Sequence, residues 1–305
     1  MMNLARGNKN FLEVIGELVD MNLEQKLTKK GKQMIIGNVD VEVKKGDKVN
    51  VIELKVLCMA GNKLYKGVET VMNEYKTRKI DGVGEKIKVQ GNVELNEYVG
   101  NDGSLKSFNV CNARFFHRLS EAEYAETGDR AMLTLGGTYL GNKEIMDKEG
   151  LPTGEYEITV YNRAYNSTSK QNDKINCLKG LKMSGELFEI FENEFSQGEN
   201  MLLNIEVNRG VIAKEEPEEK KGFGMQPKVV NNSYYWSYDV VGGISTGMSE
   251  EEDIVELERL RRVQLAEISG DGLATNGKGF GQKPQANDQP QTDTGLDPFS
   301  SDIPF

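Results

Sequence analysis

The side chains best placed to do chemistry in this sequence are cations and aromatic rings, which together can bind a polyanion that carries planar bases. The densest basic cluster is Lys26, Lys29, Lys30 and Lys32, in a predicted loop. Further candidates in the first third of the chain are Lys55, Tyr98, Lys106, Phe108, Arg114, Phe116 and Arg118. We predict that the lysines and Arg114 contact phosphates and that Tyr98 stacks on a base. The competing interpretation is a solvated lysine-rich loop, with Phe108 and Phe116 in the core.

A second candidate platform lies on the predicted strand Glu155–Tyr165. Tyr161, Arg163 and Tyr165 share one face with Thr159, while Ile158, Val160 and Asn162 belong to the other. An aromatic–cation–aromatic series on one face suits base stacking and cation–π contacts. Trp236 joins the candidate set, because Tyr234, Trp236 and Tyr238 alternate onto one face of the last predicted strand. The alternatives are tyrosines packed across strands and, for the last strand, a core or dimer surface.

Catalytic motifs are weak. Lys79–Gly82 matches K-x-D-G, the nucleophilic-lysine pattern of covalent nucleotidyltransferases, but the later motifs of that class are missing. Gly272–Gly279 resembles a phosphate-binding loop, yet Gly279 stands where a Ser or Thr is required. The single His117 and the widely separated Cys58, Cys111 and Cys177 do not form a zinc-ligand pattern. We therefore predict a protein that is not an enzyme and has no cofactor or metal.

The predicted elements that position these residues are mostly strands. Five runs alternate with period two in the first 119 residues, with a helical stretch at 62–79 between the third and fourth. They are Asn10–Asp20, Lys32–Lys44, Lys48–Met59, Glu85–Val99 and Ser104–Arg118. Residues 120–246 repeat that order with Arg130–Glu144, Glu155–Tyr165, Lys174–Met183, a helix over Gly185–Phe195, Asn200–Ala213 and Asn232–Ser245. Five strands with a helix after the third is the order of the OB-fold, which binds oligonucleotides on strands two and three.

The last sixty residues differ in composition from the rest of the chain. Ser249–Glu252 predicts a capping box that opens a helix at about 247–268. Residues 269–305 are rich in Gly, Gln, Asn, Asp and Pro and predict a disordered acidic tail. The chain ends in Asp302, Ile303, Pro304 and Phe305, which present an aromatic ring and a carboxylate together at a free end. Such a tip can bind an apolar pocket with a basic rim.

The tip and the layout resemble bacterial-type single-stranded DNA-binding proteins, whose acidic tail finishes in Asp-Ile-Pro-Phe. The resemblance implies sequence-nonspecific binding of single-stranded DNA and recruitment of replication, recombination and repair proteins through Asp302–Phe305. Most bacterial members have one OB domain, whereas this chain is predicted to have two, and the acidic run before the tip is thin. These departures resemble a diverged, bacteriophage-encoded version. The overall prediction is an all-β protein with minor α: two tandem OB-fold-like five-stranded barrels, a short helix and the tail.

Composition sets the remaining limits. The 305 residues carry a net charge of −10 and a mean hydropathy of −0.54, with about +5 in residues 1–119, −8 in 120–245 and −7 in 246–305. A local basic surface with an acidic tail fits a protein that binds an anion at one place only. The sequence shows no apolar span and no secretory signal, so we expect a cytoplasmic protein without a membrane partner and predict a homo-oligomer, with a dimer as the guess. The alternative is an adaptor that has the tail but does not bind DNA.

Overall fold

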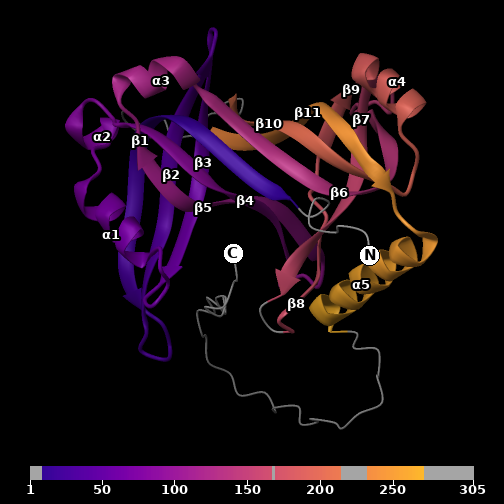
Figure 1. The fold of residues 1–305 in the computed structure, drawn as a ribbon, viewed down its shortest axis with the longest axis horizontal. Helices are drawn as coiled ribbons and strands as arrows, with labels where there is room; N and C mark the ends of the chain where they lie inside the picture. Colours follow the sequence, from indigo (N-terminus) through magenta and orange to yellow (C-terminus); the bar gives the residue numbers. More distant parts are fainter. Residues whose placement is uncertain (1–8, 167–168, 214–231, 271–305) are drawn as a thin grey trace, which may run out of the picture.

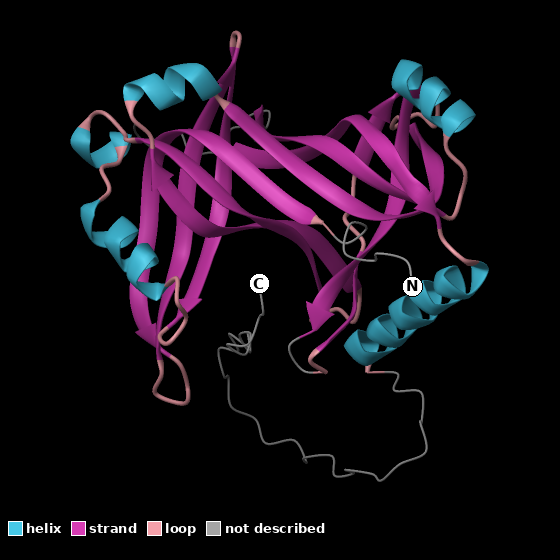
Figure 2. Ribbon diagram, in the orientation of Figure 1, coloured by secondary structure: helices cyan, strands magenta, loops and turns pink. Residues whose placement is uncertain are grey.

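The computed structural model describes residues 9–166, 169–213 and 232–270, and these form an arch of strands with helices at its two ends (Figure 1). All eleven strands belong to one continuous sheet in the order β2-β3-β5-β4-β1-β6-β10-β11-β9-β7-β8. Figure 2 shows how far strands dominate this part of the chain. The predicted fold class, mostly β with minor α, is confirmed; the tail beyond Gly270 lies outside the described residues.

The first five strands close into a barrel. They are β1 (Asn10–Leu27), β2 (Gln33–Lys45), β3 (Lys48–Met59), β4 (Lys86–Val99) and β5 (Leu105–Arg118). β1 pairs with both β2 and β4, β4 pairs with β5, and β5 runs parallel to β3, which completes the ring. This is the predicted OB-type order. Prediction placed the end of β1 at Asp20, whereas the strand continues to Leu27 and so takes Lys26 out of the loop.

The strands of the second half pair in the same order. They are β6 (Arg130–Met146), β7 (Pro152–Asn166), β8 (Gln171–Asn176), β9 (Leu181–Ser184), β10 (Glu199–Ala213) and β11 (Asn232–Met248). β6 pairs with β7 and with β10, and β10 pairs with β11. β9 closes this ring, because it pairs in parallel with β11 and in antiparallel register with β7. The predicted third strand at 174–183 is divided into β8 and β9. The predicted domain boundaries at 119 and 246 remain predictions.

The two rings are joined by the antiparallel pairing of β1 with β6, from Asn10 opposite Leu135 to Ile15 opposite Arg130. Because the two rings have the same order and meet through their first strands in antiparallel register, an approximate twofold axis relates them. The side-chain alternation that predicted the strands also builds the core. In β3, for example, Ile52, Leu54 and Val56 are buried and alternate with half-exposed residues.

Helices cover the ends of the arch. α1 (Tyr65–Glu74), α2 (Arg78–Asp81) and α3 (Glu121–Thr127) lie by the first ring, and α4 (Gly185–Glu194) and α5 (Glu251–Ser269) by the second (Figure 1). The predicted capping box at Ser249 is wrong: Glu250 is the N-cap of α5, without a side-chain cap, and Ser249 lies one residue outside. A true capping box, Ser120 with Glu123, starts α3, which the sequence analysis missed. None of the described helices is long and apolar enough to span a membrane.

Candidate nucleic-acid interface

Each ring extends its last hairpin onto the other ring. The β10–β11 hairpin reaches β3, where Asn50 donates to Asn208 at 3.0 Å and Arg209 donates to the Val51 carbonyl at 3.4 Å. The β4–β5 hairpin reaches β8, where the buried Asn176 accepts from the Leu95 N–H at 2.7 Å and donates to the Val93 carbonyl at 3.0 Å. The outer face of the second and third strands of one ring is therefore flanked by the hairpin of the other.

A cation–aromatic cluster forms where β11 leaves its own barrel. Alternate residues of β11 share its inner face. Val240 and Tyr238 are buried inside the barrel, and Trp236 and Tyr234 lie on the part of the strand that extends beyond it toward β3. The Arg209 guanidinium lies 4.2 Å from the Tyr234 ring centre and 5.5 Å from that of Trp236. It also donates to a Glu53 carboxylate oxygen on β3 at 3.1 Å. Tyr234 is 52% exposed, whereas Trp236 is half-buried and stacked on Tyr238, so the accessible ring of this cluster is Tyr234.

The face beside this cluster mixes one cation with two acids. Lys55 lies two residues after Glu53 on the same face of β3, opposite Asn38 on β2. Asp40 is opposite Glu53, and one of its carboxylate oxygens is buried and has no hydrogen-bond partner in the part of the chain that the structure describes. Burial and the neighbouring Glu53 carboxylate raise the pKa of Asp40. Phosphates would therefore be attracted at Lys55 and repelled near Asp40, which confines a polyanion path to one end of the face.

The lysine cluster lies at that end. Lys29 and Lys30 occupy the exposed β1–β2 turn, and Lys32 immediately precedes β2. Lys26 is in β1, opposite Met34, and its ammonium pairs with Glu24. Gly31, with a φ of 75°, allows the chain to reverse in this turn. These four lysines are exposed, and their contact with phosphates stays a prediction.

Tyr98 and Lys106 lie far from the lysine cluster. Both belong to the β4–β5 hairpin, which extends to β8 of the second ring (Figure 1). Tyr98 packs edge-on against Phe108 with 6.2 Å between ring centres, and both rings are nearly half exposed. Lys106 pairs with Asp102 at 3.5 Å. The sequence analysis grouped these residues with the lysines, but the structure separates them because the hairpin crosses to the other ring.

Two other predicted residues of the first ring have structural partners. Arg114 on β5 donates to Asn92 at 3.3 Å and lies 3.8 Å from Glu94. Arg118 donates to Glu85 at 2.7 Å, and its guanidinium covers Tyr75. Phe116 packs against the hydrophobic core, which was the alternative interpretation for this ring, whereas Phe108 is exposed rather than buried.

The second predicted platform faces α5. Ile158, Val160 and Asn162 are buried, as expected, and Tyr161, Arg163 and Tyr165 lie on the opposite face of β7. Burial raises the pKa of Tyr161, whose hydroxyl lies near Arg261 and Glu258 of α5. Arg163 lies near Glu256, another α5 residue, and contributes to lowering its pKa. The sequence analysis treated this face as exposed; it is half-buried in the structure.

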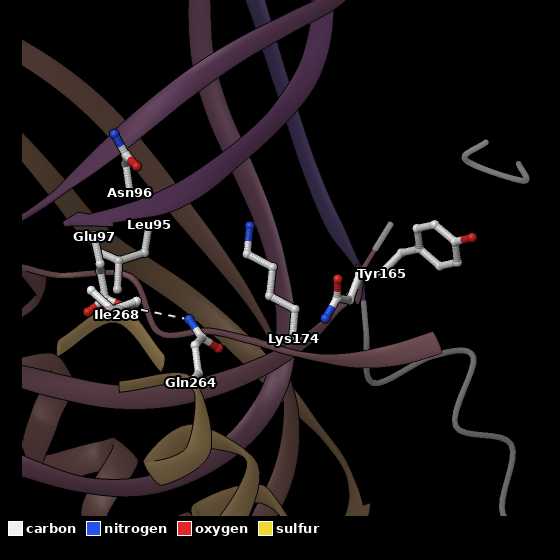
Figure 3. Close-up of a pocket in the computed structure, with 8 residues that line it drawn as sticks. Leu95, Asn96, Glu97, Tyr165, Lys174, Gln264 and Ile268 are labelled. Atoms are coloured by element: carbon white, nitrogen blue, oxygen red, sulfur yellow. Dashed lines mark hydrogen bonds between the residues drawn. The ribbon is translucent and has the colours of Figure 1, made fainter. Parts of the chain in front are cut away.

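A pocket of about 280 Å³ lies between α5, β4, β8 and the end of β7, and the Tyr165 ring points away from the α5 residues that line it (Figure 3). It is lined by Leu95, Asn96, Glu97, Tyr165, Asn166, Lys174, Gln264 and Ile268. Lys174 lies 3.5 Å from Glu94, so β4 and β8 are also linked by charge here.

Several residues important to this arrangement were missed. Arg209 carries no sequence signal beyond an isolated arginine in a strand. Glu97 and Arg261 form a bidentate pair at 2.5 and 2.6 Å, with side-chain exposures of 2% and 8%. Glu97 lies near the hairpin end of β4, and the sequence of α5 does not distinguish Arg261 from Arg259 and Arg262. Only the packing of α5 on β4 and β8 makes the pair visible.

The motif at Lys79 has a structural explanation. Lys79 pairs with Asp20, and Asp81 accepts a hydrogen bond from the Thr77 N–H at 2.8 Å at the start of α2. The hydrogen bond and charge of Asp20 raise the pKa of Lys79, which opposes the neutral amine that a nucleophile requires. The described residues contain no cluster of potential metal ligands. The loop-like segment Gly272–Gly279 and the tip Asp302–Phe305 lie outside the described residues.

Comparisons with known proteins add a family and a set of similar structures. No curated protein sequence matches this chain. The wild-type single-stranded DNA binding protein of Thermus aquaticus aligns with a TM-score of 0.45 and 11% identity, over 79% of this chain and 95% of its own. A deletion mutant of the same protein gives 0.45 and 13%, over 81% and 98%. A Plasmodium falciparum SSB complex with ssDNA gives 0.25 and 12%, over 37% and 96%. Residues 9–270 match the YorF family, and the chain therefore belongs to the YorF family.

Proposed function

We propose that this protein binds single-stranded DNA without sequence preference, through the outer face of β2 and β3 and the β10–β11 hairpin beside it. The observation that supports the proposal most strongly is the cluster of Arg209, Tyr234 and Trp236, which contacts β3 at Glu53, two residues before Lys55. It places aromatic rings beside a cation on the strand-two and strand-three face of a barrel with OB order.

The chemistry of this face favours nonspecific binding. Every base has a π-face that can stack on Tyr234, whatever its identity, and lysines contact phosphates, which carry no sequence information. The proposed path runs from the Lys29–Lys32 turn past Lys55 to Tyr234. The acidic pair Asp40 and Glu53 marks its edge.

Further roles belong to the same proposal. The tip Asp302–Phe305 would recruit replication, recombination and repair proteins, because a terminal ring with a carboxylate suits an apolar pocket with a basic rim. We also propose that the protein is cytoplasmic and forms a homo-oligomer, which we take to be a dimer.

The test is a fluorescence titration of the purified full chain with oligo-dT at low and high salt, following Trp236 and the tyrosines. Tight binding that weakens as salt rises is expected, because phosphate contacts release counterions. A chain lacking Asp302–Phe305 should bind DNA at least as tightly and fail to capture partner proteins. Absence of binding by both chains would refute the proposal and leave the adaptor as the alternative.

A further inference from the structure

The approximate twofold axis gives the molecule two comparable clefts. In the first, β3 faces the β10–β11 hairpin, and Arg209 of β10 pairs with Glu53 of β3 at 3.1 Å. In the second, β8 faces the β4–β5 hairpin, and Glu94 of β4 pairs with Lys174 of β8 at 3.5 Å. The two cross-ring pairs occupy corresponding places with their charges exchanged. Each cleft also has an aromatic hairpin wall, with Tyr234 in the first and Phe108 and Tyr98 in the second.

Only the second cleft has a helix packed into it among the described residues. α5 lies beside β8 (Figure 1) and is fixed to both sides of the cleft. Arg261 binds Glu97 of β4 through two hydrogen bonds, and Gln264 accepts from the Ile175 N–H of β8 at 3.0 Å. Leu257 is 3% exposed, so the helix is also held by an apolar anchor.

The covered face has the chemistry of a stacking platform. Tyr161, Arg163 and Tyr165 alternate along β7, and α5 brings carboxylates to it, with Glu256 near Arg163 and Glu258 near Tyr161. The acidic side chains of α5 therefore occupy the place that the phosphates of single-stranded DNA would take on this face. The apolar anchor of α5 likewise buries surface that the bases would otherwise cover.

We propose that the outer face of β7 and β8 is a second site for single-stranded nucleic acid, and that α5 masks it. The inference rests on the proposed function of the first face. It follows that the chain as it stands binds one strand, through the β2–β3 face. Loss of α5 from its cleft exposes Tyr161 and Arg163, which then form a second site together with Tyr165 at the edge of the cleft.

The test removes the two anchors of α5 in the full chain with Leu257→Ser and Arg261→Ser together. The matched control is Val255→Ser with Arg259→Ser, because Val255 is 56% exposed and Arg259 pairs with Glu256 of its own helix. Binding stoichiometry is measured with oligo-dT of about ten nucleotides, a length within the range that one OB barrel occupies. Wild type and control should bind one oligonucleotide per chain, and the anchor variant should bind two.

Adding Arg163→Ala and Tyr165→Ala to the anchor variant should return the stoichiometry to one, and the same two changes in the wild type should leave binding unchanged. A folded anchor variant that still binds one oligonucleotide overturns the inference while leaving the proposed function intact. Absence of binding by the wild type would instead be a failure of the proposed function.

A second measurement does not depend on the folding of the anchor variant. Photo-crosslinking of oligo-dT to the wild-type chain should give adducts on the β2–β3 face or at Tyr234. Adducts at Tyr161 in the wild type would show that α5 does not mask this face, and would overturn the inference.

Discussion

Tyr234→Ala should weaken binding of single-stranded DNA without unfolding the protein. The Tyr234 ring is 52% exposed, and its centre lies 4.2 Å from the Arg209 guanidinium. Arg209 therefore covers one face of the ring, and the exposed part of the ring is accessible to a base. Stacking of one base contributes about 1–3 kcal/mol. Loss of this platform should therefore raise the Kd for oligo-dT about 5-fold to about 150-fold. Arg209 keeps its contacts with Trp236 and Glu53 in the variant, so the hairpin should stay in place.

The adjacent Tyr235 provides the matched control. It is 49% exposed and lies on the opposite face of β11, where its ring covers Gly210. Tyr235→Ala removes the same number of atoms at the same hairpin but should leave the Kd nearly unchanged. The assay is titration with oligo-dT at constant salt, with circular dichroism to verify the fold. Equal Kd values for Tyr234→Ala and the wild type, or equal losses in both variants, would refute the assignment of this face.

Three further predictions concern charge. Lys55→Ala should reduce the slope of log K against log salt for single-stranded DNA by about 0.7, the value for one phosphate contact, in titrations at several salt concentrations; an unchanged slope would exclude Lys55 from the path. Arg78 hydrogen-bonds to Glu42 and lowers the pKa of that carboxyl from 4.5 to about 2. Because this pKa is lowered, the pair stabilises the fold fully above about pH 4.5, and the contribution of at most about 3 kcal/mol is lost as pH falls toward 2. Urea unfolding of Arg78→Met should therefore show a deficit at pH 7 that shrinks at pH 3, whereas a constant deficit would contradict the linkage. Arg261→Met should lower the free energy of unfolding in urea by about 3–5 kcal/mol, because Glu97 is left buried and unpaired. The double variant Arg261→Met with Glu97→Leu should recover most of that loss. If it does not, the loss comes from packing rather than from charge.

The strand order of both rings could be predicted because it depends on local alternation. In β3 every second residue is apolar, and β7 follows the same pattern except at the buried Asn162; a strand with one buried face requires such alternation. The errors fall where another interaction outweighs the local signal. β1 continues to Leu27 because its polar end still pairs with β2. α5 starts at Glu251 with Glu250 as its N-cap, although Ser249 looks like a better cap.

The candidate site could be predicted only in part. The lysines of the β1–β2 turn are exposed because charged turn residues remain in water, which sequence alone can indicate. Tyr98 was assigned to the same surface, but its position depends on where the β4–β5 hairpin lies in space. Asn176 and Arg261, which hold that hairpin, are more than 75 residues away in the sequence.

The sequence by itself determined the all-β class, the OB-type order of strands and the residue types that could bind a single strand, because these follow from periodicity and side-chain chemistry. Only the tertiary structure decided which of those residues share a surface. The pairing of β1 with β6 directs each hairpin to the opposite ring, which places the Arg209–Tyr234 pair against Glu53 of β3. Packing of α5 likewise brings Arg261 and Glu258 near Tyr161. Such contacts join residues distant in the chain, and their register is set by packing and buried hydrogen bonds that no local pattern encodes.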